Sequence, residues 1–200
     1  MRNDHPRLVV GVSGASGAPL AVEALRALRA AGVETHLVVS GGGALTIPQE
    51  TGLTLDQFCA LADVCYDSRD VGAAIASGTF PTLGMLVIPC SMKTAAGICS
   101  GYSDNLLLRA ADVTLKEGRP LVLCARESPL SAIHLRNLYE LARMGVRIVP
   151  PMLTYYTGTC QAADMTRHIV GKCLDQFQIP YPSRTCWTGL TPEAEVENTL

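Results

Sequence analysis

The sequence lacks a hydrophobic run long enough to cross a membrane, because no stretch reaches the roughly 18 uninterrupted apolar residues that a spanning helix needs. Residues 1–7 are charged and contain no apolar core of the kind found in secretion signals. Together these absences predict a protein that is located in the cytoplasm and has no membrane partner.

Metal-binding patterns are also missing. The eight cysteines form no C-x-x-C pair and no cysteine and histidine cluster at the spacing of a zinc site, so no metal is expected. An even number of cysteines is compatible with disulfides. The lack of a secretion signal and the apolar surroundings of Cys124 nevertheless favour reduced, buried thiols.

Charge is scarce. Charged residues make up 17% of the chain, the net charge is -2, and the lysines and arginines are scattered, so nucleic acid is not an expected partner. The hydrophobic fraction of 48% indicates extensive burial, part of which we expect between subunits. A length of 200 residues suits one α/β domain.

Short β-branched runs alternate with longer helical patterns along the chain. The alternation predicts strands at residues 7–12, 34–39, 85–88, 121–124 and 147–149, and helices at 19–31, 105–116 and 131–144. Strands that alternate with helices form a parallel sheet with helices on both faces. We therefore predict a three-layer α/β fold in a single domain.

Two segments depart from this alternation. Residues 41–84 show helical and loop-like patterns without an evident strand, so we expect them to cover the carboxyl edge of the sheet. After Pro180 the chain becomes polar and contains prolines, which predicts an extended tail that docks through Trp187. The chain thus divides into a domain at 1–179 and a tail at 180–200.

Small residues fill the connection between the first strand and the first helix. Gly14, Ala15 and Ser16 lie in this loop, where small side chains let the backbone approach an anion and the amides at the helix start donate hydrogen bonds to it. The loop predicts a phosphate site. Neither the full dinucleotide fingerprint nor a Gly-Lys-Ser/Thr sequence is present, which favours a mononucleotide. A tight turn without a ligand is the alternative.

A second polar loop follows the strand at 85–88 and contains Ser91, Met92, Lys93 and Thr94. Ligands of open parallel sheets bind beyond the carboxyl ends of the strands, so we expect both loops to open toward one crevice. The hydroxyls of Ser91 and Thr94 could instead cap the helix that follows.

Charged residues lie around the strand at 121–124. Arg126 and Glu127 leave this strand at its carboxyl end, where catalytic groups concentrate in α/β folds, and Arg109 and Lys116 precede it in a helix. If the three cations meet, they would suit phosphate groups, and Glu127 could act as general acid or base. A structural ion pair and solvated helix charges are the alternatives.

Taken together, the two loops, the charged residues and further short segments of the sequence resemble the flavin prenyltransferases of the UbiX type. This family includes the small B subunits associated with phenolic-acid decarboxylases. The matching strings appear in family order from about residue 7 to residue 178. They lie at residues 11–18, 76–80, 84–94, 109–113, 115–117, 126–130 and 134–135.

The resemblance implies a Rossmann-like or flavodoxin-like parallel sheet, assembled into homo-oligomers that are often dodecamers, with FMN near the subunit interfaces. It implies the transfer of a dimethylallyl group from dimethylallyl monophosphate to N5 and C6 of reduced FMN, without a metal. The prenylated FMN would then pass to a UbiD-type decarboxylase that acts on aromatic acids.

Position by position, the resemblance also implies roles for single residues. It assigns acid and base catalysis to Ser16, Glu50 and Glu127. The implied FMN contacts are Gly14, Ala15, Ser16, Ser40, Ser91, Met92, Lys93, Thr94 and Arg126, and the implied contacts of the prenyl phosphate are Arg109, Lys116, Tyr156 and Lys172.

Two departures from the family pattern leave alternatives open. Residues 153–159 lack the prolines that the family has around its Phe-Tyr pair, and Lys172 stands where arginine is frequent, which keeps the charge but loses the planar guanidinium. An FMN carrier that transfers no prenyl group is therefore an alternative function. An FMN-dependent cysteine decarboxylase on the related fold is another.

Overall fold

The structure of the chain is a computed structural model that describes residues 6–156, 161–183 and 189. Trp187, which was expected to dock the tail, lies outside the described residues. Within the described residues, no helix combines the length and the hydrophobicity that crossing a bilayer requires.

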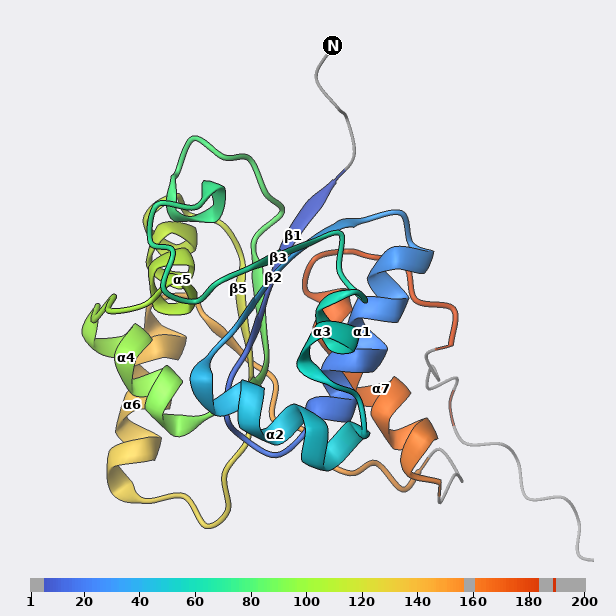
Figure 1. Cartoon of the computed structure of the whole chain (residues 1–200). Helices are drawn as coiled ribbons and strands as arrows, with labels where there is room; N and C mark the ends of the chain where they lie inside the picture. The colour runs from blue at the N-terminus through green and yellow to red at the C-terminus, as the bar shows by residue number, and fades with distance from the viewer. Residues whose placement is uncertain (1–5, 157–160, 184–188, 190–200) are drawn as a thin grey trace, which may run out of the picture.

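Parallel strands form one six-stranded sheet (Figure 1). The strands are β1 (Arg7–Val12), β2 (Glu34–Val39), β3 (Val64–Tyr66), β4 (Met85–Cys90), β5 (Leu121–Ala125) and β6 (Arg147–Ile148). Their order is β3-β2-β1-β4-β5-β6, so the direction of winding reverses between β1 and β4. Such a reversal opens a crevice beyond the carboxyl ends of the two strands, where α/β proteins bind ligands.

Helices cover both faces of the sheet (Figure 1), which confirms the predicted three-layer fold. The helices are α1 (Ala18–Ala30), α2 (Gly41–Thr51), α3 (Leu55–Cys59), α4 (Met92–Ser100), α5 (Leu106–Lys116), α6 (Ala132–Arg143), α7 (Ala162–Asp175) and the short 3-10 helix η1 (Ala74–Ala76). Helices α1, α3 and α7 lie on one face, and α4, α5 and α6 lie on the other.

Alternate residues of the strands enter two separate hydrophobic clusters. In β1, Leu8, Val10 and Val12 pack with α1 and α7, whereas Val9 packs on the opposite face with α4 and α5. Burial on both faces explains why the strands read as continuous apolar runs in the sequence.

Helices at the carboxyl edge of the sheet begin at capping hydroxyls. Ser40 caps α2, Ser91 caps α4 and Ser131 caps α6, each by accepting a hydrogen bond from the backbone amide three residues later. Because these helices follow β2, β4 and β5, their first turns gather at one edge of the sheet.

The expectation for residues 41–84 was wrong in two respects. The segment contains β3, whose three residues are too few to show a strand pattern and are only partly buried or exposed. Residues 78–80 also lie at the amino edge of the sheet, because the guanidinium of Arg119, just before β5, donates to the carbonyl oxygens of Gly78 (2.6 Å) and Phe80 (2.8 Å).

The chain continues to pack on the core after α7. Phe177 and Ile179 are buried in the cluster beside α1, and the hydroxyl of the partly buried Tyr181 donates a hydrogen bond to Glu23 of α1. The boundary between domain and tail at 179 and 180 stays a prediction.

The carboxylate of Asp63 joins β3 to β2. It accepts hydrogen bonds from the backbone amide (2.7 Å) and the hydroxyl (2.8 Å) of Thr35. The hydrogen bond from the Thr35 backbone amide is the main reason why the pKa of Asp63 lies below its ordinary value. Desolvation raises this pKa, whereas the hydrogen bond from the Thr35 hydroxyl and the charge of Arg29 lower it further. A carboxyl group whose pKa falls on folding stabilises the folded state at pH values above its pKa in the unfolded chain, which is about 4. This stabilisation is lost as the pH falls through the lower pKa of the folded state.

We therefore expect Asp63→Ala to lower the melting temperature at neutral pH. The difference from the unsubstituted protein should shrink as the pH falls below about 4, where the Asp63 carboxylate of the unsubstituted protein becomes protonated. Thermal unfolding across this pH range measures both effects, and a difference that does not change with pH would contradict a role for the charge.

Candidate functional site

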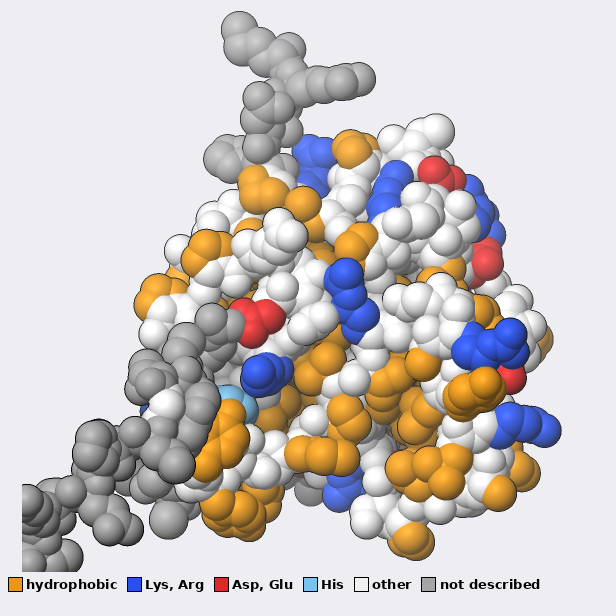
Figure 2. All heavy atoms as spheres, turned by 180° about the vertical axis from the view of Figure 1, so that it is seen from behind, with side chains coloured by type: hydrophobic (Ala, Val, Ile, Leu, Met, Phe, Trp, Pro, Cys, Tyr) orange, Lys and Arg blue, Asp and Glu red, His pale blue; other side chains and the backbone are white. Residues whose placement is uncertain are grey.

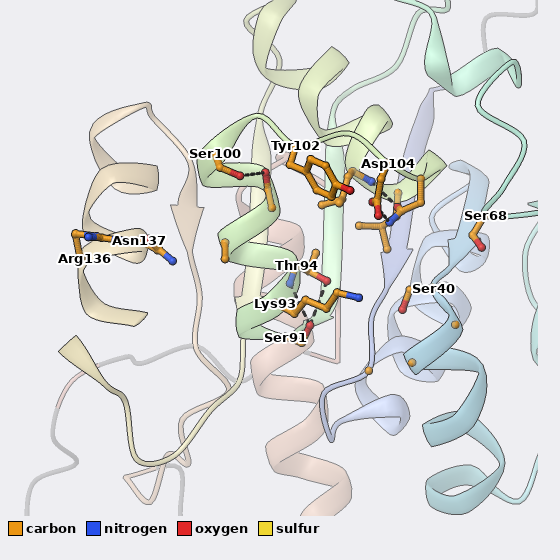
Figure 3. A pocket seen from close by; sticks show the side chains of 18 residues that line it. Ser40, Ser68, Ser91, Lys93, Thr94, Ser100, Tyr102, Asp104, Arg136 and Asn137 are labelled. Atoms are coloured by element: carbon orange, nitrogen blue, oxygen red, sulfur yellow. Dashed lines mark hydrogen bonds between the residues drawn. The ribbon is translucent and has the colours of Figure 1, made fainter. Parts of the chain in front are cut away.

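A cavity of about 770 Å³ opens at the carboxyl edge of the sheet (Figure 3). This volume lies in the range of small-molecule sites, about 300 to 1,000 Å³. Five of the predicted FMN contacts line it, namely Gly14, Ser40, Ser91, Lys93 and Thr94. They follow β1, β2 and β4, so the loops after these three strands face one cavity, and the Lys93 side chain points toward Ser40 (Figure 3).

The other four predicted FMN contacts lie elsewhere. Ala15 and Met92 are buried, each with 8% of its surface exposed. Ser16 and Arg126 are exposed and interact with Glu50, at the end of α2. The predicted set therefore splits into a cavity wall and a polar cluster around Glu50.

Sequence reasoning missed several residues that line the cavity. They include Gly41, Gly42, Ser68, Ser100, Tyr102, Asp104, Asn105, Arg136 and Asn137. The run of three glycines at 41–43 could have been recognised, since it follows a predicted strand directly. The others come from the α4–α5 connection, from α6 and from the loop after β3, and nothing in their spacing indicates that these segments meet.

Gly14 and Gly42 touch backbone to backbone. A Cβ atom on Gly14 would lie 2.8 Å from Gly42 Cα, and one on Gly42 would lie 3.0 Å from Gly14 Cα. A side chain at either position would crowd the backbone of the other, and the cavity wall carries no side chain where the loops after β1 and β2 meet. A wall of bare backbone next to helix starts suits a phosphate group.

The hydroxyls of Ser40 and Ser91 cap the starts of α2 and α4. Ser40 Oγ accepts from the Gly43 amide (3.1 Å), and Ser91 Oγ accepts from the Thr94 amide (3.3 Å) while donating to Thr94 Oγ1 (3.1 Å). The alternative that Ser91 caps a helix is thus confirmed. It is compatible with a ligand site, because the first turns of α2 and α4 both line the cavity.

The Glu50 carboxylate accepts hydrogen bonds from the backbone amides at the start of α1. The backbone amides of Gly17 and Ala18 each donate to Glu50 Oε2 at 2.8 Å, and the Ser16 hydroxyl adds a further hydrogen bond. Desolvation raises the pKa of Glu50, but these hydrogen bonds and the charge of Arg126 outweigh it, so the pKa lies below its ordinary value. Glu50 is therefore ionised at neutral pH and accepts a hydrogen bond from Ser16.

This contact changes where a phosphate can bind. The amides at the start of α1, which the sequence analysis assigned to a phosphate, serve the carboxylate of Glu50 instead. A phosphate would also be repelled by the negative charge of Glu50. The first turns of α2 and α4, together with Lys93, are the part of the cavity wall that suits an anion.

Arg126 and Glu127 follow β5 and are both exposed. The Arg126 amide donates to the Cys90 carbonyl oxygen at 3.0 Å, which holds this loop against the end of β4. Glu127 Oε1 accepts from the Ser128 amide at 3.0 Å, so the carboxylate is turned toward its own loop.

The described residues contain no group of three or more His, Cys, Asp or Glu side chains arranged to hold a metal ion.

Arg109 and Lys116 lie on α5. Arg109 pairs with Asp112 (2.7 Å) and donates to the Ala76 carbonyl oxygen (3.3 Å), and Lys116 pairs with Glu117. Lys116 ends α5 at the amino edge of the sheet, whereas Glu127 follows β5 at the carboxyl edge. The five residues of β5 span about 16 Å. One chain therefore does not bring Lys116 together with Arg126 and Glu127.

Lys172 lies on α7, and Tyr156 packs beside this helix. The Tyr156 ring meets the His168 ring edge to face, with centroids 6.2 Å apart, and Lys172 follows His168 by one helical turn. Both Tyr156 and Lys172 are exposed, so an anion can reach them.

Comparison with known proteins identifies the family. A model of the Flavoprotein family matches residues 1–177. A probable UbiX-like flavin prenyltransferase of Streptomyces sp. (strain D7) is 54% identical over 185 residues, which cover 92% of this chain and 92% of the relative. The chain belongs to the Flavoprotein family, and within it to the UbiX-like flavin prenyltransferases.

Two solved structures of UbiX-like proteins share its fold. The dodecameric FMN-dependent UbiX-like decarboxylase from Escherichia coli O157:H7 has a TM-score of 0.90 at 52% identity and covers 92% of this chain and 100% of its own. AnUbiX, solved in complex with FMN and dimethylallyl pyrophosphate, has a TM-score of 0.92 at 45% identity and covers 94% of this chain and 100% of its own. The resemblance found in the sequence is confirmed.

The contact between Gly14 and Gly42 in this UbiX-like chain predicts a stability effect. Gly14→Ala would place a methyl group against the Gly42 backbone and should lower the free energy of unfolding by about 1 to 3 kcal/mol. Gly41→Ala is the matched control, because Gly41 lines the same cavity but nothing lies within 4 Å of its Cβ position. We expect the control to change stability by less than about 0.5 kcal/mol. Urea unfolding of both variants tests this, and equal stabilities would mean that the contact relaxes.

Proposed function

We propose that this chain is a flavin prenyltransferase that transfers a dimethylallyl group from dimethylallyl monophosphate to reduced FMN and supplies prenylated FMN to a UbiD-type decarboxylase. The observation that carries the proposal is the pair formed by the Ser16 hydroxyl and the ionised Glu50 carboxylate, held at the loop whose Gly14 lines the cavity. A location in the cytoplasm stays an expectation from the sequence.

The cavity residues fit FMN. We expect the flavin phosphate between the first turns of α2 and α4, near Ser40, Ser91, Lys93 and Thr94, because Glu50 occupies the amides of α1. Gly14 would form part of the wall, Ala15 and Met92 are proposed contacts from the same two loops, and Arg126 would contact the flavin beside Glu50. When bound, reduced FMN supplies the N5 and C6 positions that accept the dimethylallyl group.

Ser16 and Glu50 are suited to proton removal. The lowered pKa keeps the Glu50 carboxylate ionised at neutral pH, and the Ser16 hydroxyl is bonded to it. A proton released during ring closure can pass to the Ser16 oxygen while the Ser16 proton passes to Glu50. Glu50→Gln should therefore slow turnover.

Glu127 is the proposed proton donor to the departing phosphate, which needs both a proton and nearby positive charge. Arg109, Lys116, Tyr156 and Lys172 are the proposed sources of charge and hydrogen bonds. Since Lys116 and Glu127 lie at opposite edges of one sheet, we infer that a neighbouring subunit supplies Arg109 and Lys116 to each site.

Exposed hydrophobic side chains support assembly into a homo-oligomer. Between residues 130 and 156 many large apolar side chains are exposed, among them Ile133 (61%), Tyr139 (60%) and Met152 (71%). Helix α6 buries only Leu141 among its 12 residues. Hydrophobic side chains gather over the lower half of the face shown in Figure 2, and monomers rarely expose patches of this kind. The dodecameric relative supports an assembly of the same size here.

Mass analysis of the flavin tests the proposed function directly. The chain is incubated without oxygen with reduced FMN and either dimethylallyl monophosphate or the diphosphate, and the flavin is then extracted. A flavin heavier by one dimethylallyl group is expected with the monophosphate. Unmodified, protein-bound FMN would favour the carrier function, and release of carbon dioxide from a peptide with a C-terminal cysteine would favour the cysteine decarboxylase.

Sharing of sites between subunits predicts complementation. Lys116→Ala and Glu127→Gln should each bind FMN but turn over poorly. When the two variants are produced in one cell and assemble together, some sites receive both unsubstituted residues, so activity should return. The double variant Lys116→Ala/Glu127→Gln is the control and should stay inactive. Mixed assemblies that are no more active than the single variants would contradict shared sites.

A clamp on the prenyl phosphate is predicted at Tyr156 and Lys172. Loss of one charge-assisted hydrogen bond in Tyr156→Phe or Lys172→Ala should weaken donor binding by about tenfold to a hundredfold, with little effect on FMN binding. Titration of dimethylallyl monophosphate against each variant measures this. Unchanged donor affinity in both variants would remove the clamp and favour the FMN carrier.

A further inference from the structure

Ser13 lies at the reversal of strand order, between the loops after β1 and β4, and only 1% of its surface is exposed. Its hydroxyl donates a hydrogen bond to the Pro89 carbonyl oxygen (2.9 Å) and accepts one from the Ser91 amide (2.7 Å). One side chain thus joins two segments that are 76 to 78 residues apart in the sequence.

The Ser13 hydroxyl is committed to these bonds. Its single proton is donated in the hydrogen bond to the Pro89 carbonyl oxygen, which also accepts a hydrogen bond from the Ser13 backbone amide at 3.2 Å. A hydroxyl whose proton is bound in this way, in a side chain out of contact with solvent, cannot serve as a proton relay. Its function is therefore one of geometry.

The place of Ser13 explains why a hydroxyl is needed there. Direct pairing of β1 with β4 ends at Gly11 and Val87, and the register of β4 against β5 shifts between Val87 and Cys90. Beyond this point the ladder becomes irregular: the Ser13 backbone amide donates to the Pro89 carbonyl oxygen, and the Ser91 amide takes its acceptor from the Ser13 side chain. The hydroxyl therefore adds two hydrogen bonds to the single backbone bond that joins the two segments where their regular pairing ends.

Both partners of Ser13 lead directly to the cavity. Ser91 caps α4, whose first turn carries Lys93 and Thr94 into the cavity wall. On the other side, Gly14 follows Ser13 and touches Gly42 at the start of α2. A shift at Ser13 would therefore change the distance between the start of α4 and the loop that carries Ser16.

We propose that Ser13 is a positioning residue for the flavin: its hydroxyl sets the spacing between the first turn of α4 and the loop at 14–16. The phosphate end and the reacting end of one flavin are thereby held at a fixed separation, although Ser13 touches neither. The inference rests on the proposed function, in that the ligand of the cavity is FMN.

The test compares hydroxyl loss at two buried positions. FMN is titrated into the full chain and into Ser13→Ala, Ser13→Thr and Thr114→Val, with flavin fluorescence as the readout. Thr114 is the control, because it is also buried (3% exposed) and its hydroxyl donates to the Ala110 carbonyl oxygen (2.7 Å) within α5, away from the cavity. Turnover with dimethylallyl monophosphate is then measured at saturating FMN.

Ser13→Ala is expected to raise the Kd for FMN by about tenfold to a hundredfold and to lower turnover even when FMN is saturating. Ser13→Thr keeps the oxygen and should restore both values to within about threefold. Thr114→Val should lower the melting temperature and leave both values unchanged.

An unchanged Kd and unchanged turnover in Ser13→Ala would overturn the inference, whatever its melting temperature. If Ser13→Ala does not fold, Ser13→Cys replaces it, since the thiol is a weaker partner of similar size: a raised Kd supports the inference and an unchanged one overturns it. Should the unsubstituted chain bind no FMN, the proposed function fails first, and the inference fails with it.

Discussion

Burial of the sheet on both faces is the constraint from which the rest of this structure follows. The central strands β1, β4 and β5 are buried along almost their whole length, so a polar side chain in the middle of the sheet would lose its contact with water without gaining a partner. In these three strands polar chemistry is therefore confined to the ends. The carboxyl edge holds the cavity and Glu50, and the amino edge holds Lys116 and Arg119.

The carboxylate of Glu50 then divides the carboxyl edge into two parts. A helix start attracts anions, and α1 satisfies this preference within the protein by binding Glu50. The starts of α2 and α4 serve the cavity. A fixed negative charge beside Ser16 and a region suited to phosphate near Lys93 are thus separated along the same edge, which would orient a flavin with one acidic end.

The fold and five of the 18 residues that line the cavity could be predicted from the sequence, for reasons that differ between elements. The strand at 7–12 is mostly apolar and the strand at 34–39 ends in an apolar run, and both lie next to clear helical patterns, so local sequence indicates them. β3 has three residues, and its place at the sheet edge depends on Asp63 and Thr35. Local sequence contains no signal for such a strand.

Apart from the helix caps at Ser40 and Ser91, the contacts that organise the site are long-range. The role of Glu50 could be predicted through the family resemblance, but its bonds to the start of α1 join residues 32 and 33 positions apart. Ser13 was one small residue in a loop of small residues, and its burial arises only once β4 lies beside β1. Pairings of this kind are properties of the folded sheet, and no window of sequence contains them.

The shallow burial of α6 has a consequence for how this protein holds its shape. With only Leu141 buried among 12 residues, few hydrophobic contacts within one chain oppose the opening of this helix. Subunits that cover Ile133 and Tyr139 would supply the missing contacts. Ordering of α6 and association of subunits would then be a single equilibrium, and the rigidity of the Arg136 and Asn137 side of the cavity would depend on protein concentration.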